Sequence, residues 1–310
     1  MAKKIVFMGT PMFAVPILKS LYQNGYNVSV VYTQPPQKSN RGQKINKSPI
    51  QSISETLNID FRSPSHLKGN DEEYRFIKEL NADLAIVVAY GQIIPKKFLN
   101  LTKKGFINIH GSILPKWSGA APIQRSIMNL ETETGISIMK ISEALDSGPV
   151  SNIYKIKIDK NENSEEISEK LSLLAAEKIL DNIDNIFEGK AIFKDQDESK
   201  ATYAKKINKT ESKINWKEEA TKILGKINGL SPLPGAYFNF NGERYKVLKA
   251  EIGNGTGKPG EVISDKLEIA CENNQSIRII EIQRQGKKSQ KVGEFLLGSK
   301  IKKGLILPDV

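Results

Sequence analysis

Apolar residues recur along the first two thirds of the chain in two alternating spacings. Short apolar runs, typical of buried β-strands, lie at residues 4–8, 28–32 and 84–89,. Residues 12–22 and 164–187 instead carry apolar positions at the three- and four-residue spacing of a helix,. Strand and helix segments that alternate in this way predict an α/β domain with a mostly parallel sheet. The ligand sites of such sheets lie beyond the carboxyl ends of the strands.

The pattern changes in the last third of the chain, after Pro232-Leu233-Pro234-Gly235. A helix predicted at residues 215–227 is followed by five short β-rich segments, which turn signals such as Asn241-Gly242 separate,. Short strands at this spacing predict a small antiparallel, OB-like β-barrel. The five segments are residues 236–240, 245–252, 260–264, 267–271 and 276–283.

The two patterns predict two domains and a link. Residues 1–189 form the predicted α/β domain, residues 208–310 the barrel domain, and the polar, weakly periodic residues 190–207 the link between them,. The length of 310 residues agrees with this division, since domains commonly have about 100–200 residues,.

Positive charge is concentrated in the last third. The chain has 46 Lys and Arg against 35 Asp and Glu, a net charge of +11. Residues 204–310 hold 20 basic and 12 acidic residues, so they carry +8 of this excess. A basic domain beside a nearly neutral one favours a polyanionic partner. Solvated lysines of a lysine-rich proteome explain the charge about equally well.

A second basic segment follows an early strand. Residues 33–49 contain Lys38, Arg41, Lys44 and Lys47 and no acidic residue. Prolines and a glycine oppose regular structure there, so we expect a long polar loop. Such a loop is either an arm that meets phosphates or simply an exposed, solvated segment.

The composition argues against several classes of protein. One Cys excludes an internal disulfide framework, and two His argue against a His-rich metal site,. The longest apolar run, residues 84–90, is far shorter than the roughly 20 residues that span a bilayer,. Lys3 and Lys4 precede an apolar stretch as in a signal peptide, but Gly9-Thr10-Pro11 breaks it early,. We expect a cytoplasmic protein with no membrane partner, which also suits the single Cys.

One predicted strand, residues 105–109 with His110 after it, carries polar residues at its carboxyl end. Asn108 and His110 are two apart and therefore point to the same face, about 7 Å apart along the strand,. An imidazole can move protons near neutral pH, and an amide N–H can stabilise a developing oxyanion. The pair suits addition to a carbonyl through a tetrahedral intermediate. Two polar side chains with purely structural hydrogen bonds are the alternative, and spacing does not select the carboxylate that would complete the set.

At these residues the sequence resembles the folate-dependent formyltransferases. The resemblance is carried first by Asn108-Ile109-His110-Gly111-Ser112-Ile113-Leu114-Pro115 and by Trp117-Ser118-Gly119-Ala120-Ala121-Pro122-Ile123-Gln124-Arg125. It extends over nearly the whole chain. Further similar segments are Phe7-Met8-Gly9-Thr10-Pro11, Ala89-Tyr90-Gly91-Gln92-Ile93-Ile94-Pro95, Leu145-Asp146-Ser147-Gly148-Pro149, Pro234-Gly235-Ala236, Gly286-Lys287-Lys288 and Phe295-Leu296-Leu297-Gly298.

The resemblance implies a fold, a reaction and a site. It implies a Rossmann-like catalytic domain, no metal, and transfer of a formyl group from 10-formyltetrahydrofolate to the α-amine of methionine on initiator tRNA. Asn108 and protonated His110 would donate to the oxyanion, and Asp146, rather than the nearby Glu143, would pair with the imidazole. The implied folate-binding residues are Tyr90, Gly91, Gln92, Ile93, Ile94, Ser112, Ile113, Leu114 and Pro115. Trp117 is expected to be a packing or lid residue.

The same resemblance assigns the basic residues to tRNA. The implied contacts are Lys38, Arg41, Lys44, Lys47, Lys287 and Lys288, with Arg41 the strongest candidate by its position in the loop. Asn228 stands where relatives often have Arg, which puts one phosphate contact in doubt. We expect a monomer.

Two other classes of function stay open at this stage. A formyltransferase for a small nucleotide or sugar amine would use the same N-terminal chemistry without needing a basic second domain. A non-catalytic RNA-binding protein with a decayed enzyme domain is the other, against which the intact Asn108, His110 and Asp146 argue.

Overall fold

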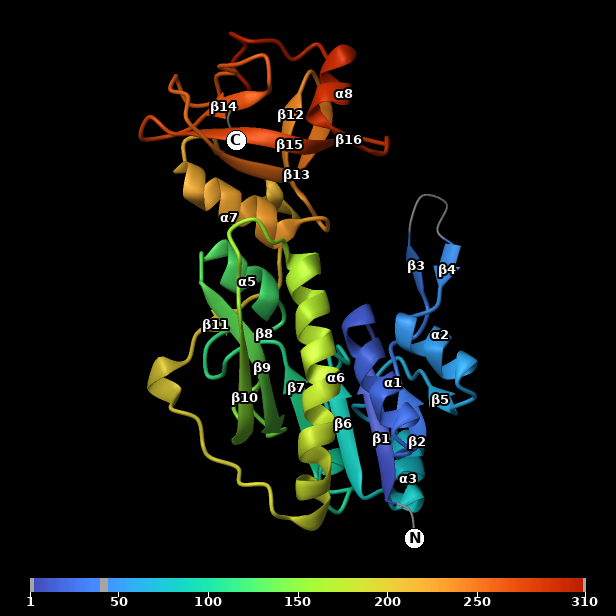
Figure 1. Ribbon diagram of the computed structural model, residues 1–310. Helices are drawn as coiled ribbons and strands as arrows, with labels where there is room; N and C mark the ends of the chain where they lie inside the picture. The colour runs from blue at the N-terminus through green and yellow to red at the C-terminus, as the bar shows by residue number, and fades with distance from the viewer. Residues whose placement is uncertain (1–2, 40–43, 309–310) are drawn as a thin grey trace. The chain divides into compact units, whose positions relative to one another are not determined.

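The computed structural model describes residues 3–39 and 44–308, which divide into two compact units. Unit 1 comprises residues 1–119, 135–156 and 168–203, and unit 2 comprises residues 120–134, 157–167 and 204–310. Each unit is built around its own sheet (Figure 1).

A seven-stranded sheet forms the centre of unit 1, in the order β10-β9-β7-β6-β1-β2-β5. The strands from β7 to β5 are parallel, whereas β9 runs antiparallel to β7. This mostly parallel sheet confirms the predicted fold class. The strands are β1 (Lys4–Gly9), β2 (Asn27–Tyr32), β5 (Phe61–Arg62), β6 (Leu84–Val88), β7 (Phe106–His110), β9 (Glu133–Lys140) and β10 (Val150–Lys157).

Helices cover both faces of this sheet (Figure 1). Val6 and Met8 of β1 belong to a buried cluster with Ile77 of α3 and Phe98 near α4's end. The alternate side chains of β1 point to the other face, where α1 and α6 lie and where Ser20 of α1 donates to a carbonyl of α6,. The helices are η1 (Met12–Ala14), α1 (Val15–Gln23), α2 (Pro49–Thr56), α3 (Asp71–Leu80), α4 (Lys96–Leu99), α6 (Ser164–Glu188) and η2 (Glu198–Lys200).

Residues 33–49 differ from the predicted continuous loop. They contain two short strands, β3 (Gln37–Ser39) and β4 (Lys44–Asn46), that pair antiparallel. Backbone groups alone make such a ladder, so the polar composition did not reveal it. The remaining short strands, β8 (Ser118–Gly119) and β11 (Tyr203–Ala204), were likewise not predicted.

Unit 2 is a five-stranded antiparallel sheet with helices packed on it. The order is β12-β13-β15-β14, and β16 pairs with β15. Its core holds Trp216, Phe238, Tyr245 and Phe295, whose rings contact one another in sequence. The elements are α5 (Pro122–Met128), η3 (Lys209–Ser212), α7 (Ala220–Leu230), β12 (Ala236–Phe240), β13 (Glu243–Gly253), β14 (Glu268–Ala270), β15 (Ser276–Arg284), β16 (Ser289–Lys291) and α8 (Val292–Leu297).

Two predicted elements of unit 2 were wrong in detail. The helix predicted from residue 215 begins at Ala220, because Glu219 is extended and bridges Glu272 while Trp216 enters the core. Residues 260–264 form isolated bridges rather than a strand, and the fifth strand is the polar, exposed β16. The antiparallel half-barrel itself was correctly predicted.

Candidate active site

Strand β7 brings Asn108 and His110 to the same face of the sheet at its carboxyl end. Asn108 is paired with Val87 of β6 and Met139 of β9, so its backbone position is fixed from both sides. Ile107 and Ile109 alternate with them and are buried on the other face,. The polar pair therefore lies where an α/β sheet presents its ligands, as the alternation predicted.

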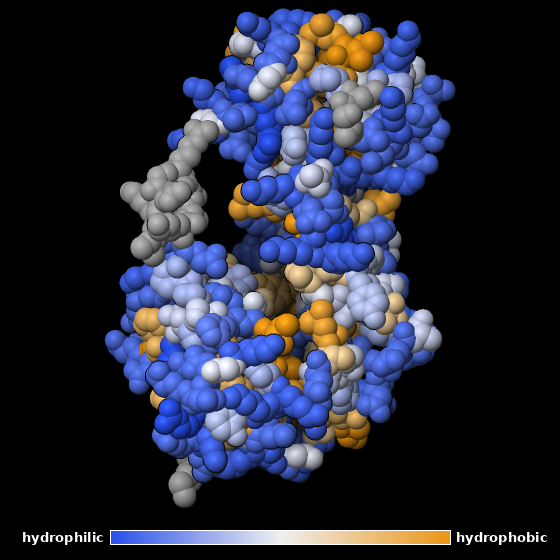
Figure 2. Space-filling model, turned by 180° about the vertical axis from the view of Figure 1, so that it is seen from behind, coloured by the Kyte–Doolittle hydropathy of each residue, from blue (hydrophilic) through white to orange (hydrophobic). Residues whose placement is uncertain are grey.

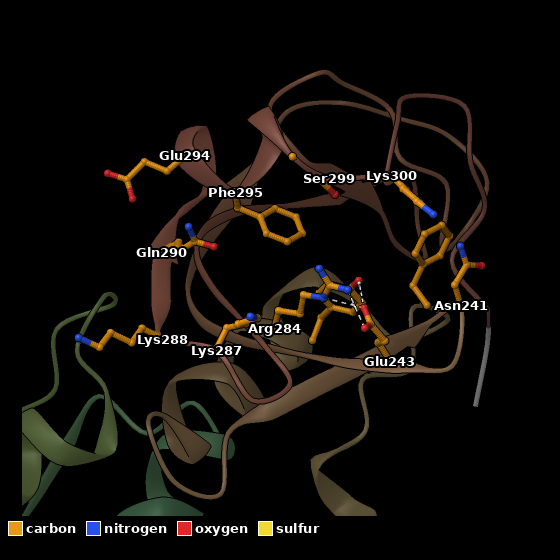
Figure 3. Close-up of a pocket in the computed structure, with 13 residues that line it drawn as sticks. Asn241, Glu243, Arg284, Lys287, Lys288, Gln290, Glu294, Phe295, Ser299 and Lys300 are labelled. Carbon is orange, nitrogen blue, oxygen red and sulfur yellow. Dashed lines mark hydrogen bonds and ion pairs between the residues drawn. The ribbon is translucent and has the colours of Figure 1, made fainter.

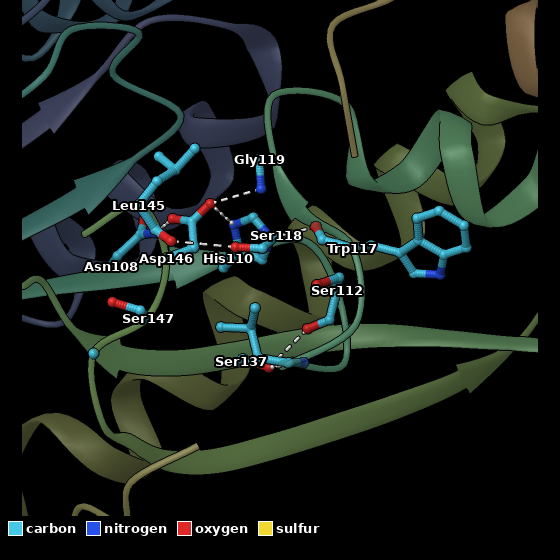
Figure 4. A network of polar contacts seen from close by, with 12 residues as sticks. Asn108, His110, Ser112, Trp117, Ser118, Gly119, Ser137, Leu145, Asp146 and Ser147 are labelled. Atoms are coloured by element: carbon cyan, nitrogen blue, oxygen red, sulfur yellow. Dashed lines mark hydrogen bonds and ion pairs between the residues drawn. The ribbon is translucent and has the colours of Figure 1, made fainter. Parts of the chain in front are cut away.

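Both side chains converge on the carboxylate of Asp146 (Figure 4). Asn108 donates from Nδ2 to Oδ1 over 3.4 Å, and Oδ2 lies 3.7 Å from His110 Nδ1. The imidazole is 7% exposed and the carboxylate 12% exposed, so water screens this group of charges little,. Neighbouring Glu143 instead pairs with Lys96 at the surface.

The other imidazole nitrogen faces a backbone acceptor. His110 Nε2 lies 3.0 Å from the carbonyl oxygen of Trp117. A carbonyl oxygen can only accept, so Nε2 carries a hydrogen in this arrangement. A second hydrogen on Nδ1 would point toward Asp146, and the surroundings thus complement a protonated imidazole. Sequence reasoning did not foresee the Trp117 carbonyl, because backbone contacts leave no signal in residue identity.

The loop that carries Asp146 holds an unusual backbone conformation. Asp146 has φ = 48°, in the left-handed region, and its Oδ2 accepts the N–H of Gly119 over 2.8 Å. At Gly148 a Cβ would stand 1.9 Å from the carbonyl oxygen of Lys140, so only glycine permits this approach,. Gln196 donates from Nε2 to the carbonyls of Asp146 and Gly148, each over 2.8 Å. Neither Gly119 nor Gln196 was predicted as a site residue.

Residues 90–94 follow the carboxyl end of β6. Tyr90 is buried, its hydroxyl has no hydrogen-bond partner among the described residues, and burial raises the pKa of its phenol. Gly91 has φ = 83°, and Gln92 donates to the carbonyl of Pro64 while its own buried Oε1 is unpaired. Ile93 is 86% exposed and Ile94 packs partly on the core.

Residues 112–115 form the other predicted folate segment. Ser112 is buried, and its hydroxyl donates to the carbonyl of Lys116. The carbonyl of Ser112 accepts a hydrogen bond from the hydroxyl of Ser137. That hydroxyl also accepts the N–H of Leu114. The Leu114-Pro115 peptide bond is cis, and Ile113 is half-buried. Ser137 of β9 thus organises this turn, although the sequence did not single it out.

Exposed apolar side chains accompany these loops. The surface is mostly hydrophilic, with hydrophobic side chains gathered in small patches (Figure 2). Among the large exposed hydrophobic residues are Met12 after β1, Ile93 after β6 and Leu145 next to Asp146. Apolar surface beside polar peptide groups is the character of a small-molecule site.

Two family models cover most of the chain. Residues 3–183 match the formyl transferase family, and residues 206–300 match the formyl transferase C-terminal domain. The chain belongs to the formyltransferase family.

Full-length relatives of this formyltransferase are methionyl-tRNA formyltransferases. One from Pelagibacter ubique is 66% identical over 310 residues, with all of both chains covered. One from Chelativorans sp. is 40% identical over 98% of this chain and 99% of its own, and one from Brucella abortus is 41% identical over 97% and 100%.

Solved structures share the fold at low identity. The N-formyltransferase from Helicobacter canadensis, in complex with folinic acid and dTDP-3-aminofucose, matches with a TM-score of 0.68 at 19% identity, over 90% of this chain and 99% of that chain. HypX from Aquifex aeolicus, in complex with tetrahydrofolic acid, matches with a TM-score of 0.66 at 17% identity, over 98% and 51%.

Unit 2 of the formyltransferase has a cavity of about 660 Å³ that includes predicted tRNA-binding residues. Lys287 and Lys288 lie at its edge, with Arg284 and Lys300 also lining it (Figure 3). Arg284 is held by Glu243 over 2.7 Å, whereas Lys287 and Lys288 are exposed. Sequence reasoning missed Arg284 and Lys300, which reach the cavity from β15 and from beyond α8.

The other predicted tRNA contacts are in residues 37–47. Lys38 belongs to β3 and Lys44 to β4, the two strands that pair antiparallel. Lys47 follows β4 and pairs with Glu55 of α2 over 2.8 Å. Arg41 lies outside the residues that the structure describes.

Asn228 points into unit 2. It is buried in α7 and donates from Nδ2 to the carbonyl of Lys160 over 3.0 Å. Its side chain therefore has a structural hydrogen bond inside unit 2 and is not exposed for a phosphate contact.

Residues 3–39 and 44–308 lack both a cluster of side chains for a metal ion and a helix for a membrane span. No group of three or more His, Cys, Asp or Glu side chains there could hold a metal ion. Within those same residues, no helix has the length and apolarity needed to cross a membrane.

Proposed function

We propose that this formyltransferase moves the formyl group of 10-formyltetrahydrofolate to the α-amine of methionine esterified to initiator tRNA. The observation that carries this proposal is the 66% identity to a methionyl-tRNA formyltransferase over the full length of both chains. The basic C-terminal unit supports it, because a small amine would not require a second, polyanion-binding domain,.

The proposed chemistry uses Asn108, His110 and Asp146. Attack of the neutral amine on the formyl carbon turns its oxygen into an alkoxide. One Nδ2 hydrogen of Asn108 is directed to Asp146, which leaves the second for that oxygen,. As the tetrahedral intermediate collapses, the bond from the formyl carbon to N10 breaks, and the proton that the amine loses passes to N10.

His110 is the proposed proton carrier. Its Nε2 hydrogen is held by the carbonyl of Trp117, so the ring must exchange this partner for the oxyanion, a reacting nitrogen or a bound water,. Asp146 orients the ring from the Nδ1 side and supplies the negative charge that complements an imidazolium,.

We propose that two segments line the folate-binding site, residues 90–94 and residues 112–115. The segment after β6 offers what a pterin needs: an exposed apolar side chain at Ile93 and polar groups at Gln92, whose buried Oε1 has no partner within residues 3–39 and 44–308,. These features fit a flat heterocycle with a polar edge. When bound there, the folate supplies the activated formyl group.

The tRNA-binding residues proposed are Lys38, Arg41, Lys44, Lys47, Lys287 and Lys288. Lys287 and Lys288 are exposed at the edge of the cavity in unit 2, where phosphates could reach them,. We place the catalytic domain, which also carries the basic segment of residues 38–47, in residues 1–189 and the tRNA-binding barrel domain in residues 208–310, joined by residues 190–207. We further propose that the protein is cytoplasmic, where translation uses the formylated tRNA, and that it is a monomer.

One assay tests the reaction. Purified protein is incubated with radiolabelled 10-formyltetrahydrofolate and either methionyl-initiator tRNA, methionyl-elongator tRNA, or small amino sugars linked to nucleotides. We expect label on the initiator tRNA, with elongator tRNA a poorer acceptor. Transfer only to a sugar or nucleotide amine would establish the alternative, and no transfer to any acceptor would refute both. Arg41→Ala should weaken transfer to tRNA, and unchanged kinetics and salt dependence would exclude its proposed role.

A further inference from the structure

The polar segment predicted as a link lies along the active-site loops of unit 1. Lys194 and Val150 of β10 form an antiparallel β-bridge, in which each N–H donates to the other residue's carbonyl over 2.8 and 2.9 Å. Eight residues later, the N–H of Thr202 donates to the carbonyl of Pro115. Residues 194–202 therefore run from one edge strand of the sheet to the turn that follows β7.

Within this segment, the side chain of Gln196 hydrogen-bonds to the loop that contains Asp146. Its Nε2 donates to the carbonyls of Asp146 and Gly148, both over 2.8 Å. A side-chain amide has two N–H hydrogens, one for each carbonyl. An isosteric carboxylate could not make these two bonds, because its oxygens would face two acceptors.

The loop needs such a support from outside. Asp146 has φ = 48°, a left-handed conformation that Asp adopts more readily than most residues but that still costs free energy relative to the right-handed region,. Ser147 is exposed, and its hydroxyl bonds within the loop, to Ser142 and to the carbonyl of Ala144. Gln196 is half-buried and contacts the loop at the very residue whose carboxylate meets Asn108, Gly119 and His110.

The same segment supports the partner of the imidazole. Thr202 accepts from the N–H of Trp117 through its Oγ1 over 2.9 Å, and its carbonyl accepts the N–H of Ser118 over 2.9 Å. The carbonyl of Trp117 is the acceptor that faces His110 Nε2. One extended segment thus supports the backbone on both sides of the proposed proton carrier.

We propose that Gln196 is a positioning residue for formyl transfer. By binding the carbonyls of Asp146 and Gly148, it keeps the Asp146 carboxylate within contact distance of Asn108 and His110. This inference rests on the proposed function, since it assumes that Asp146 acts in the reaction. Gln196 does not touch substrate in this role. Its hydrogen bonds therefore affect the rate of the chemical step and do not affect the affinity for either substrate.

Three variants test the role in the full-length protein. Gln196→Ala removes both donors, Gln196→Glu replaces them with acceptors, and Gln196→Lys restores a donor of similar reach. The single-turnover rate with radiolabelled 10-formyltetrahydrofolate and methionyl-initiator tRNA should fall about 10- to 100-fold in the Ala variant, because small displacements of catalytic groups cost this much. The KM values for both substrates should stay within about threefold, as uniform binding is unaffected.

Two readouts separate positioning from general stability. The Lys variant should recover part of the rate lost in the Ala variant. The rate of the Glu variant relative to the Ala variant should rise as the pH falls toward 5, because a protonated carboxyl regains one donor. Asn24→Ala is the matched control: Asn24 also donates a side-chain amide hydrogen to a carbonyl, that of Ser20 over 2.8 Å, but lies at the end of α1. It should leave the single-turnover rate unchanged.

The outcomes are distinct. An Ala variant with the wild-type single-turnover rate, or one whose loss appears in KM alone, overturns the proposal. If the Ala variant unfolds at the assay temperature, the Glu and Lys variants test the proposal instead. Equal single-turnover rates in these two variants would overturn the proposal. If wild type formylates only another amine, the proposed substrate is wrong, and the same three variants measured with that amine still decide the role of Gln196.

Discussion

Replacing Asp146 with Asn removes one charge and leaves the shape of the site almost unchanged. Asn tolerates the left-handed backbone conformation at least as well as Asp, so φ = 48° is no obstacle to folding,. The new amide has one acceptor in place of two. If its oxygen keeps the N–H of Gly119, its NH₂ faces Asn108, whose amide must turn its own oxygen inward and withdraw the donor from the oxyanion.

The loss of charge also has a calculable size. A unit charge 3.7 Å from His110 Nδ1 attracts a protonated imidazole by about 4 kcal/mol at an effective dielectric constant of about 20,. This attraction offsets the cost of burying the charged ring, and that cost is left unopposed in the variant. A loss of about 4 kcal/mol corresponds to about a 10³-fold lower rate.

Single-turnover formyl transfer measures the effect. Enzyme in excess over methionyl-initiator tRNA is mixed with saturating radiolabelled 10-formyltetrahydrofolate, and label on the tRNA is followed over time. Glu143→Gln is the control, since it removes an exposed carboxylate of the same loop and should leave the rate unchanged. A rate for Asp146→Asn within about tenfold of wild type, with normal folding by circular dichroism, would refute the reasoning.

Three further predictions follow from other contacts. Asn108→Ala should lower the single-turnover rate by about 10²-fold through the loss of one oxyanion donor, while tRNA affinity in filter binding stays the same. The Glu211 carboxylate accepts hydrogen bonds from both NH₂ groups of Arg125, over 2.6 and 3.1 Å. These bonds hold the pKa of the Glu211 carboxyl below its usual range. Glu211→Gln should therefore lower the free energy of unfolding by about 1–2 kcal/mol at pH 7. Because a lowered carboxyl pKa contributes stability only above the unfolded-state value, the difference should shrink below about pH 4, as urea titrations at both pH values would show. Replacing Lys287 and Lys288 together by Ala should raise the KM for tRNA and reduce the slope of log affinity against log salt by up to about 2, with kcat retained; an unchanged slope would remove both from the phosphate contacts.

The pattern of apolar positions was enough to predict most of the fold. Strands β1 and β6 are nearly continuous apolar runs because helices bury both faces of the sheet there, and burial on both faces leaves a strong signal,. β9 and β10 were not predicted. β10 alternates between half-buried and exposed positions, which resembles a loop in composition, and β16 is exposed throughout. Their pairing is made by backbone groups, which all residues share.

The sequence by itself determined which groups are available for chemistry and where two of them lie. The two-residue period of a strand fixes Asn108 and His110 on one face, whatever surrounds them. Only resemblance, and then the fold, chose Asp146 over Glu143, because 36 residues separate Asp146 from His110 and chain spacing does not limit such a contact. The tertiary structure alone decided the backbone partners of the site: the Trp117 carbonyl, the Gly119 N–H and the two carbonyls that Gln196 holds. Peptide groups are the same at every position, so their roles are set by where the folded chain puts them.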